Sequence, residues 1–508
     1  MRSRREAGRI DRRRLFGGVG LLAALLLASR VALAEGVRSP EAVPECRWDG
    51  PTLLIDPACA FRLARQNSFE ILDQETYLRG AVRHEALAAH DFAIQMTPTF
   101  SAVTLGNPNT TPLGNGGTGT QTASTDLYRS GLRFSKRFGI GTSVAVEPFY
   151  EWGSGNQISG LLVGVTQPLL RGVAPVYVES TLDAASSQTK VSGLSQVQSC
   201  LVTLLGVVDQ LSTLTELQER HRLFSEALLS METKLTITEA RERAGLASSL
   251  DVLRTKIERT NLRDLVASVS DQLGDAADRL RFLLRLPPGL PIRGLVSPRD
   301  APGPPEPDGG VAARLDVRIA AEGLSEARRQ VRVSRHAILP DLNATFTMSL
   351  QGGKTEYSIP SLPTWTLSIS SSGELGRPAE RAAYQDALDR VEVAARALVQ
   401  TQERARDEVR SLGRQLDRLK KQEAIQREQI EQAAAKLAIA EAKFRNGLAS
   451  NFDFLEAETE LRNAQVALLS AQRDLVPSAH RLLNGTGRYD VWLKESYAVD
   501  CAAPAAPR

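Results

Sequence analysis

The sequence predicts an α+β membrane protein: a duplicated unit that joins β-barrel strands to very long coiled-coil-like helices. Three observations predict this fold class. Segments that begin at Glu239 and Glu441, EARERAGLASSLDVL and EAKFRNGLASNFDFL, are nearly the same and lie 202 residues apart. Upstream of each segment, apolar residues keep a coiled-coil spacing over a length that no compact globule needs. Farther upstream, short segments alternate apolar and hydroxyl side chains, as strands with two different faces do.

Composition and charge exclude several classes of protein. The chain has 508 residues, with 62 lysines and arginines against 59 aspartates and glutamates, so its net charge of +3 gives no electrostatic case for a nucleic-acid partner. A hydrophobic content of 42% with 24% charged residues excludes wholesale disorder and a polytopic helical membrane protein. The four cysteines lack the CxxC spacing of zinc or redox sites.

Residues 1–34 are predicted to be a signal peptide. The basic segment RSRREAGRIDRRR precedes an apolar run from Leu15 through Leu33, and the small-residue ending places cleavage after Ala34. An N-terminal membrane anchor is the alternative, although Arg30 interrupts the apolar run. The rest of the chain has no apolar run of about 18 residues, so we expect any part that enters a membrane to do so as β-strands.

The N-terminal extension, 35–59, holds two of the four cysteines. An exported chain can oxidise its thiols, and Cys46 and Cys59 close a short loop. A disulfide between them is therefore expected, whereas Cys200 and Cys501 stay unassigned.

The duplication sets the domain organisation. A first structural repeat at 60–285 and a second at 313–487 each contain a helix, a β-region, one very long helix, a glycine turn and a return helix. The proline- and glycine-rich segment 286–312 is predicted to connect the two repeats, and residues 488–508 are predicted to form a C-terminal tail. The distance from Pro98 to Gly245 is 147 residues but that from Pro340 to Gly447 is 107, so the first β-region is about 40 residues longer.

The two long helices are expected at about 180–244 and 379–446. Each has some 65 residues and would extend about 100 Å at ~1.5 Å per residue. Gly245 and Gly447 can supply the left-handed conformation that ends such helices. Ser248 and Ser450 can then cap the return helices, with an aspartate, Asp251 or Asp453, in the first turn. The sequence therefore predicts two helical hairpins.

The strand segments show two faces. Trp365, Leu367 and Ile369 alternate with hydroxyl side chains, and Leu161 to Val165 alternate less cleanly. A membrane barrel and a half-buried soluble sheet both alternate in this way. The export signal and the long helices favour the barrel. We expect two strands from each half, and because four strands cannot close a barrel, several copies must complete it. The extra length of the first half is expected to form a hairpin with the strands GLRFSKRF and TSVAVEPFYEW, which either joins the barrel or projects from it.

Specific motifs carry a resemblance. The pattern R-x-G-L-A-S-x-x-D-x-L occurs at Arg243 to Leu253 and again at Arg445 to Leu455, TQPLLRG occurs at 166–172, and RLPPGLP closes the first half. With these motifs the chain resembles the TolC-type outer-membrane efflux protein family over residues 60–487. The resemblance implies a homotrimer in the cell outer membrane, with four strands per chain in one twelve-stranded barrel and a helical periplasmic tunnel. It also implies that the hairpin tips meet a periplasmic adaptor (membrane fusion) protein tied to an inner-membrane pump.

By this similarity, the two tips hold the adaptor-docking and aperture residues. They are Gly245, Leu246, Ala247, Ser248, Asp251, Gly447, Leu448, Ala449, Ser450 and Asp453. The alternative is that these residues only cap helices. The chain also departs from some family members, which close the aperture with a tyrosine and an arginine where Phe444 and Ala449 stand here. A closing network must then use other groups, such as Arg445 or Asp453.

Enzyme chemistry is not supported by the sequence. Residues 114–119 match GxGxxG, but no strand closely precedes them and no helix follows, so we expect a surface loop. His84 and His90 are six residues apart rather than the four of HExxH, so no catalytic residue, metal site or cofactor is predicted. The predicted function is a passive exit duct for efflux or type I secretion. A soluble periplasmic coiled-coil adaptor or scaffold is the main alternative, and an envelope-bound hydrolase a weaker one.

Overall fold

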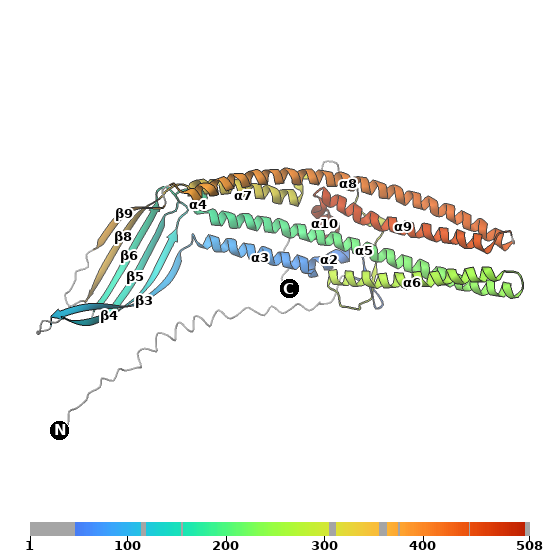
Figure 1. Ribbon diagram of the computed structural model, residues 1–508, viewed down its shortest axis with the longest axis horizontal. Helices are drawn as coiled ribbons and strands as arrows, with labels where there is room; N and C mark the ends of the chain where they lie inside the picture. The colour runs from blue at the N-terminus through green and yellow to red at the C-terminus, as the bar shows by residue number, and fades with distance from the viewer. Residues whose placement is uncertain are drawn as a thin grey trace, which may run out of the picture. The chain divides into compact units, whose positions relative to one another are not determined.

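The computed structural model describes residues 46–112, 118–153, 156–303, 311–354, 363–373, 376–446 and 448–502. The predicted signal peptide, most of the 114–119 loop and Gly447 lie outside these residues. From Cys46 onward the chain forms one unit. Within it, a six-stranded sheet lies at one end of a set of long helices, and the two helical hairpin tips lie at the other end (Figure 1).

The helices follow the predicted duplication. In chain order they are α2 (Pro57–Asn67), α3 (Phe69–His90), α4 (Pro175–Val178), α5 (Ser180–Arg243), α6 (Ser249–Leu284), α7 (Leu315–Ala337), α8 (Pro378–Arg445), α9 (Asn451–Gly485) and α10 (Tyr489–Tyr497), with 3-10 turns η1 (Pro298–Asp300) and η2 (Val311–Ala313). The long helices α5 and α8 have 64 and 68 residues, which confirms their predicted lengths. Helix α5 packs against α3 and α6, and α8 packs against α7 and α9. The repeat boundaries given above remain our proposal.

Two sheets are present in the described chain. A small one contains β1 (Arg47–Asp49), β2 (Thr52–Ile55) and β7 (Ile292–Gly294). The large one contains β3 (Gln95–Pro112), β4 (Thr118–Arg137), β5 (Ser143–Gly153), β6 (Asn156–Pro168), β8 (Asp341–Lys354) and β9 (Thr364–Ser372). Its order is β3-β4-β5-β6-β8-β9, and every neighbouring pair is antiparallel.

The expected number of strands is wrong for the first half. That half contributes four strands rather than two, because the extra hairpin, β4 and β5, is inserted between β3 and β6 in the sheet. Its two segments are strands, as predicted, and they join the sheet: β5 pairs on both sides, and β4 does so from Tyr128 to Arg137, whereas residues 118–127 pair with β3 alone. Where the strands pair on both sides, their backbone groups are hydrogen-bonded within the sheet, as a membrane requires. The two halves meet where β6 pairs with β8.

One described helix, α5, contains a stretch long and apolar enough to cross a membrane by length and composition. This is weak evidence for a span, because the same helix packs against α3, α6, α7 and α9. Its buried apolar residues instead form a core with these neighbours, among them Leu204, Leu211 and Leu214.

The middle of the helical part holds an aromatic cluster. His480 of α9 is fully buried, and its ring meets Phe61, Tyr489 and Trp492 edge-on. Burial lowers the pKa of His480 to about 4, so its imidazole is neutral in the folded protein. Its Nδ1 lies 3.1 Å from the Tyr489 hydroxyl. The cluster anchors α10 and the C-terminal segment to α2 and α9.

Candidate functional site

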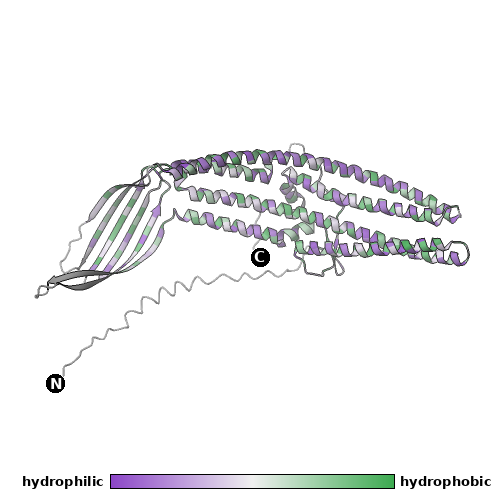
Figure 2. Ribbon diagram, viewed as in Figure 1, coloured by the Kyte–Doolittle hydropathy of each residue, from purple (hydrophilic) through white to green (hydrophobic). Residues whose placement is uncertain are grey.

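The large sheet has one apolar face. Directly paired residues of an antiparallel sheet lie on the same face, so one row of side chains can be followed across all six strands. The middle row contains Met96, Phe134, Val146, Val163, Met348 and Trp365. Figure 2 shows the alternation of hydrophobic and hydrophilic residues along these strands. Strands β5, β6, β8 and β9 have 11, 13, 14 and 9 residues, and a membrane-spanning strand needs about 9–11.

Aromatic side chains border this apolar face at the end far from the helices. Tyr128 and Tyr150 both stack on Trp152, with ring centroids 5.8 and 5.7 Å apart. All three belong to the same face as the apolar row, because β4 and β5 alternate strictly. Membrane barrels carry such aromatic girdles where the hydrocarbon meets water.

The opposite face is polar. The row beside the apolar one contains Gln95, Ser135, Ala145, Gly164, Thr347 and Thr366. At its centre, Phe149 is buried over two glycines, Gly131 and Gly160, where a Cβ would lie 3.3 and 2.6 Å from its atoms. The Arg129 guanidinium lies over the same ring, 3.8 Å from its centroid. The sheet therefore separates an apolar surface from a polar one.

The first tip is a tight turn between α5 and α6. Gly245 has φ +73°, and its N–H donates to the Glu242 carbonyl at 2.9 Å, while the Leu246 N–H donates to the Arg241 carbonyl at 2.8 Å. This pair of bonds is a Schellman motif, which satisfies carbonyls at the end of α5. Ser248 and Asp251 then form a capping box at the start of α6, as the sequence predicts. Ala247 lies between the two caps.

The second tip repeats this geometry. The Leu448 N–H donates to the Lys443 carbonyl at 2.8 Å, as Leu246 does in the first tip. Ser450 and Asp453 form the capping box of α9, and the Ser450 backbone N–H and hydroxyl lower the pKa of the Asp453 carboxyl. Ala449 again separates the caps. Gly447 lies outside the described residues, so its expected left-handed conformation stays a prediction.

The tips are apolar although they are exposed. Leu246 and Leu448 are each 78% exposed, and Phe452 and Ile257 are about half exposed. A groove of about 350 Å³ lies between α6 and α9 just above the tips, where Arg254 stacks over Phe452. The two tips therefore present exposed apolar side chains beside this groove.

A family model described as outer membrane efflux protein matches residues 311–488, which contain the second repeat, its strands and its tip. This part of the chain is similar to the outer membrane efflux protein family. The outer-membrane location expected from the sequence agrees with this match. The fold agrees: the chain is similar to the outer membrane protein VceC of Vibrio cholerae (TM-score 0.64, 15% identity, 85% of this chain and 96% of that one). It is also similar to CusC (TM-score 0.67, 16% identity, 90% and 98%).

The curated relatives of the chain are distant in sequence. Nodulation protein T of Rhizobium leguminosarum is 22% identical over 58% of this chain and 64% of its own length. The pyoverdine export outer membrane protein OpmQ of Pseudomonas aeruginosa is 24% identical over 56% of this chain and 61% of its own length. The match thus spans less than two thirds of either relative.

The two hairpins contact each other near the tips. The Asn451 amide donates to the Thr255 hydroxyl at 3.2 Å, and both residues are buried. Farther from the tips, Arg462 of α9 pairs with Glu258 of α6 at 2.6 Å. Lys234 of α5 pairs with Glu458 of α9, also at 2.6 Å. No sequence pattern predicts these contacts, although the second tip has Asn451 where the first has Ser249.

The groups suggested for a closing network do not reach across the tips in this chain. Arg445 pairs with Glu441 on its own helix, and Asp453 bonds to its own cap, Ser450. Phe444, which replaces the tyrosine of some family members, stacks on Phe454 with ring centroids 5.6 Å apart. Arg241 and Lys234 lie over these two rings, so Phe444 holds α8 against α9 and α5.

Replacing Gly245 by alanine should loosen the first tip. A Cβ there meets nothing within 4 Å, so the cost is the left-handed backbone alone, about 1–2 kcal/mol. Gly274 of α6 is equally open but helical, and alanine there should stabilise the helix by about 0.5–1 kcal/mol. Hydrogen exchange at the tip amides measures the difference, and faster exchange in both variants alike would contradict it.

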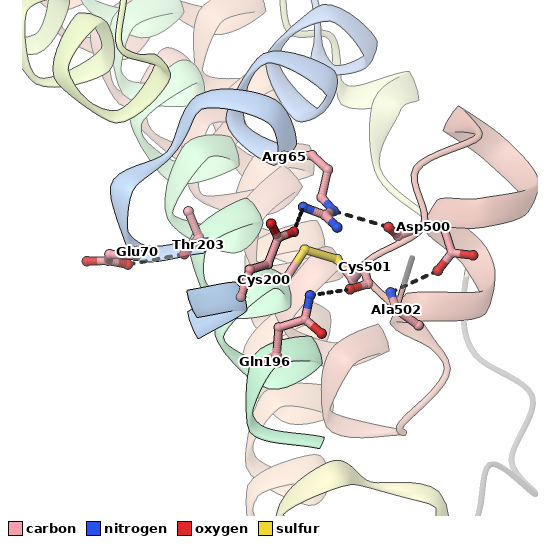
Figure 3. Close-up of a disulfide and its surroundings, with 9 residues drawn as sticks. Arg65, Glu70, Gln196, Cys200, Thr203, Asp500, Cys501 and Ala502 are labelled. Carbon is pink, nitrogen blue, oxygen red and sulfur yellow. Dashed lines mark hydrogen bonds and ion pairs between the residues drawn. A yellow bond between two sulfur atoms is a disulfide. The ribbon is translucent and has the colours of Figure 1, made fainter. Parts of the chain in front are cut away.

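Two disulfide bonds join residues of the described chain. Cys46 and Cys59 are joined in the N-terminal segment, and Cys200 of α5 is joined to Cys501 beyond α10. Around the second bond, the Gln196 amide donates to the Cys501 carbonyl, and Arg65 donates to the Asp500 carbonyl at 3.1 Å (Figure 3). The C-terminal segment is thereby tied to both α5 and α2.

Removing the Cys200–Cys501 bond should free the C-terminal segment. The bond spans 301 residues, and losing a native disulfide typically costs about 2–5 kcal/mol. We expect the C200A/C501A variant to be cleaved by trypsin after Lys494 much faster than the wild type. The C46A/C59A variant removes the other disulfide and should leave Lys494 protected; equal cleavage in both variants would contradict the assignment.

Proposed function

We propose that three copies of the chain form a passive exit duct across the outer membrane, docked to a periplasmic adaptor and, through it, to an inner-membrane pump. The observation that carries the proposal is the large sheet, which has an apolar face, a polar face and two unpaired edges, β3 and β9. Unpaired backbone groups cannot face lipid, so the edges must pair with those of other copies. With six strands per chain, three copies close eighteen strands instead of the twelve implied by the resemblance.

The helices supply the rest of the duct. Because β3 follows α3 and β6 leads to α5, the strands of each chain continue directly into helices that run away from the sheet (Figure 1). The trimer therefore carries a barrel on one end and a ring of helices below it. The exposed tip leucines, Leu246 and Leu448, lie at the far end, where an adaptor would bind.

Oligomeric state tests this proposal. We expect the detergent-purified protein to have three times the mass of one chain and to fractionate with the outer membrane. A monomer released in the soluble periplasmic fraction would instead support the coiled-coil adaptor or scaffold. That alternative is disfavoured by the sheet, because its apolar face exposes large side chains such as Phe100, Trp365 and Leu367, and soluble monomers rarely expose so large an apolar surface.

A further inference from the structure

The inserted hairpin, β4 and β5, carries nearly all the charge on the polar face of the sheet. Its polar-face side chains include Arg129, Arg133, Arg137, Glu147 and Glu151. In the described parts of the other four strands, the same face carries hydroxyl, amide, small and a few apolar side chains, with one charged residue, Asp341. Asp341 lies at the foot of β8 and pairs with Arg171. The inserted hairpin therefore both widens the sheet and supplies most of the charge on its polar face.

Part of this charge is neutralised within the hairpin. Arg129 lies 3.6 Å from Glu147, and the Thr99 hydroxyl donates to the same carboxylate at 3.4 Å. The Glu147 carboxylate thus contacts Arg129 and Thr99, and its ion pair is with Arg129. Neither Arg133 nor Arg137 has an ion-pair partner among the residues that the structure describes, and both are exposed.

The two unpaired arginines lie toward the periplasmic end of the sheet. Arg137 is the last residue of β4, at the edge where α3 enters the sheet, and Arg133 is four residues farther along, about 13 Å. Glu151 lies near the opposite end of β5. A solute that leaves the helical part therefore reaches the arginines before it reaches this carboxylate.

We propose that Arg133 and Arg137 form a basic band inside the barrel that favours small anionic solutes, those bearing carboxylate, phosphate or sulfate groups. The inference rests on the proposed trimeric duct, in which two unpaired arginines per chain give a band of six. Lipid around the barrel has a low dielectric constant and focuses the field of such a band into the lumen. Rings of arginine or lysine are the usual basis of anion preference in pores.

Ion selectivity in planar bilayers tests the basic band. The wild-type trimer should prefer chloride over potassium in a KCl gradient, and R133Q/R137Q should lower that permeability ratio about threefold or more. The K136Q variant is the matched control, because Lys136 lies between the two arginines on β4 but on the apolar face, where it pairs with Val144. K136Q should keep the wild-type permeability ratio. R133K/R137K keeps the positive charges and should keep most of that ratio.

Block of the pore current by a polyanion gives a second test of the basic band. Inorganic tripolyphosphate added to the outer side should block wild-type and K136Q current and should block R133Q/R137Q weakly. A conducting trimer in which the double glutamine variant keeps both the wild-type selectivity and the block would overturn the basic band while leaving the duct intact. A purified protein that forms no pore at all would overturn the duct, and the band with it.

Discussion

An arginine in place of Met348 should keep the chain from assembling in the outer membrane, whereas an arginine in place of its neighbour Thr347 should not. The two residues are adjacent on β8 but belong to opposite faces of the sheet. Met348 pairs with Val163 and Trp365 in the middle apolar row, and Thr347 pairs with Gly164 and Thr366 in the polar row.

The expected difference follows from the position of the new charge. On the lipid face near the bilayer midplane, an arginine costs about 2–4 kcal/mol, and a trimer incurs this cost in each of its three chains. On the lumen face the guanidinium stays in water. The amount of each variant in outer-membrane fractions, and its trimer on unheated gels, measures the outcome.

The comparison is matched for strand, depth and new side chain, so only the face differs. If both variants assembled equally well, the apolar face would not be the lipid face. If neither assembled, β8 would tolerate no large side chain on either side, and Thr347→Gln would separate size from charge.

The helical part of this fold could be predicted from the sequence because its signals are local. A coiled-coil spacing, a glycine and an S-x-x-D capping box each act within a few residues. Together they place both ends of α5 and α8 and the starts of α6 and α9 within about one residue. The loop between Cys46 and Cys59 is short, so their disulfide was also expected.

The features that could not be predicted from the sequence depend on contacts between segments that are distant in the chain. The alternation of β4 and β5 was visible, but whether this hairpin pairs with β3 and β6 or projects depends on partners elsewhere in the chain. The Cys200–Cys501 bond depends in the same way on where the chain returns after α10. The link between Asn451 and Thr255 requires two hairpins to be placed side by side, which no local pattern encodes.

The tips give the second large expected effect. Replacing both tip leucines, L246D/L448D, should reduce export to the level of a strain that lacks the gene, although the trimer still forms. Both side chains are 78% exposed and touch no core, so their loss should not unfold either hairpin. The capping boxes of Ser248 and Ser450 use other atoms and remain intact.

Burying an apolar side chain at an interface contributes about 1.5–3 kcal/mol to the free energy of binding. An aspartate at the same place adds the cost of burying a charge. Because a trimer carries six substituted positions, adaptor binding should be abolished. The conservative variant L246M/L448M keeps the apolar surface and should keep export. Survival on a panel of toxic compounds in the natural host measures export, and unheated gels confirm the trimer. Full export by L246D/L448D would show that the leucines only end two hairpins, whereas loss of export in the methionine variant as well would indicate that the turns need leucine for their own shape.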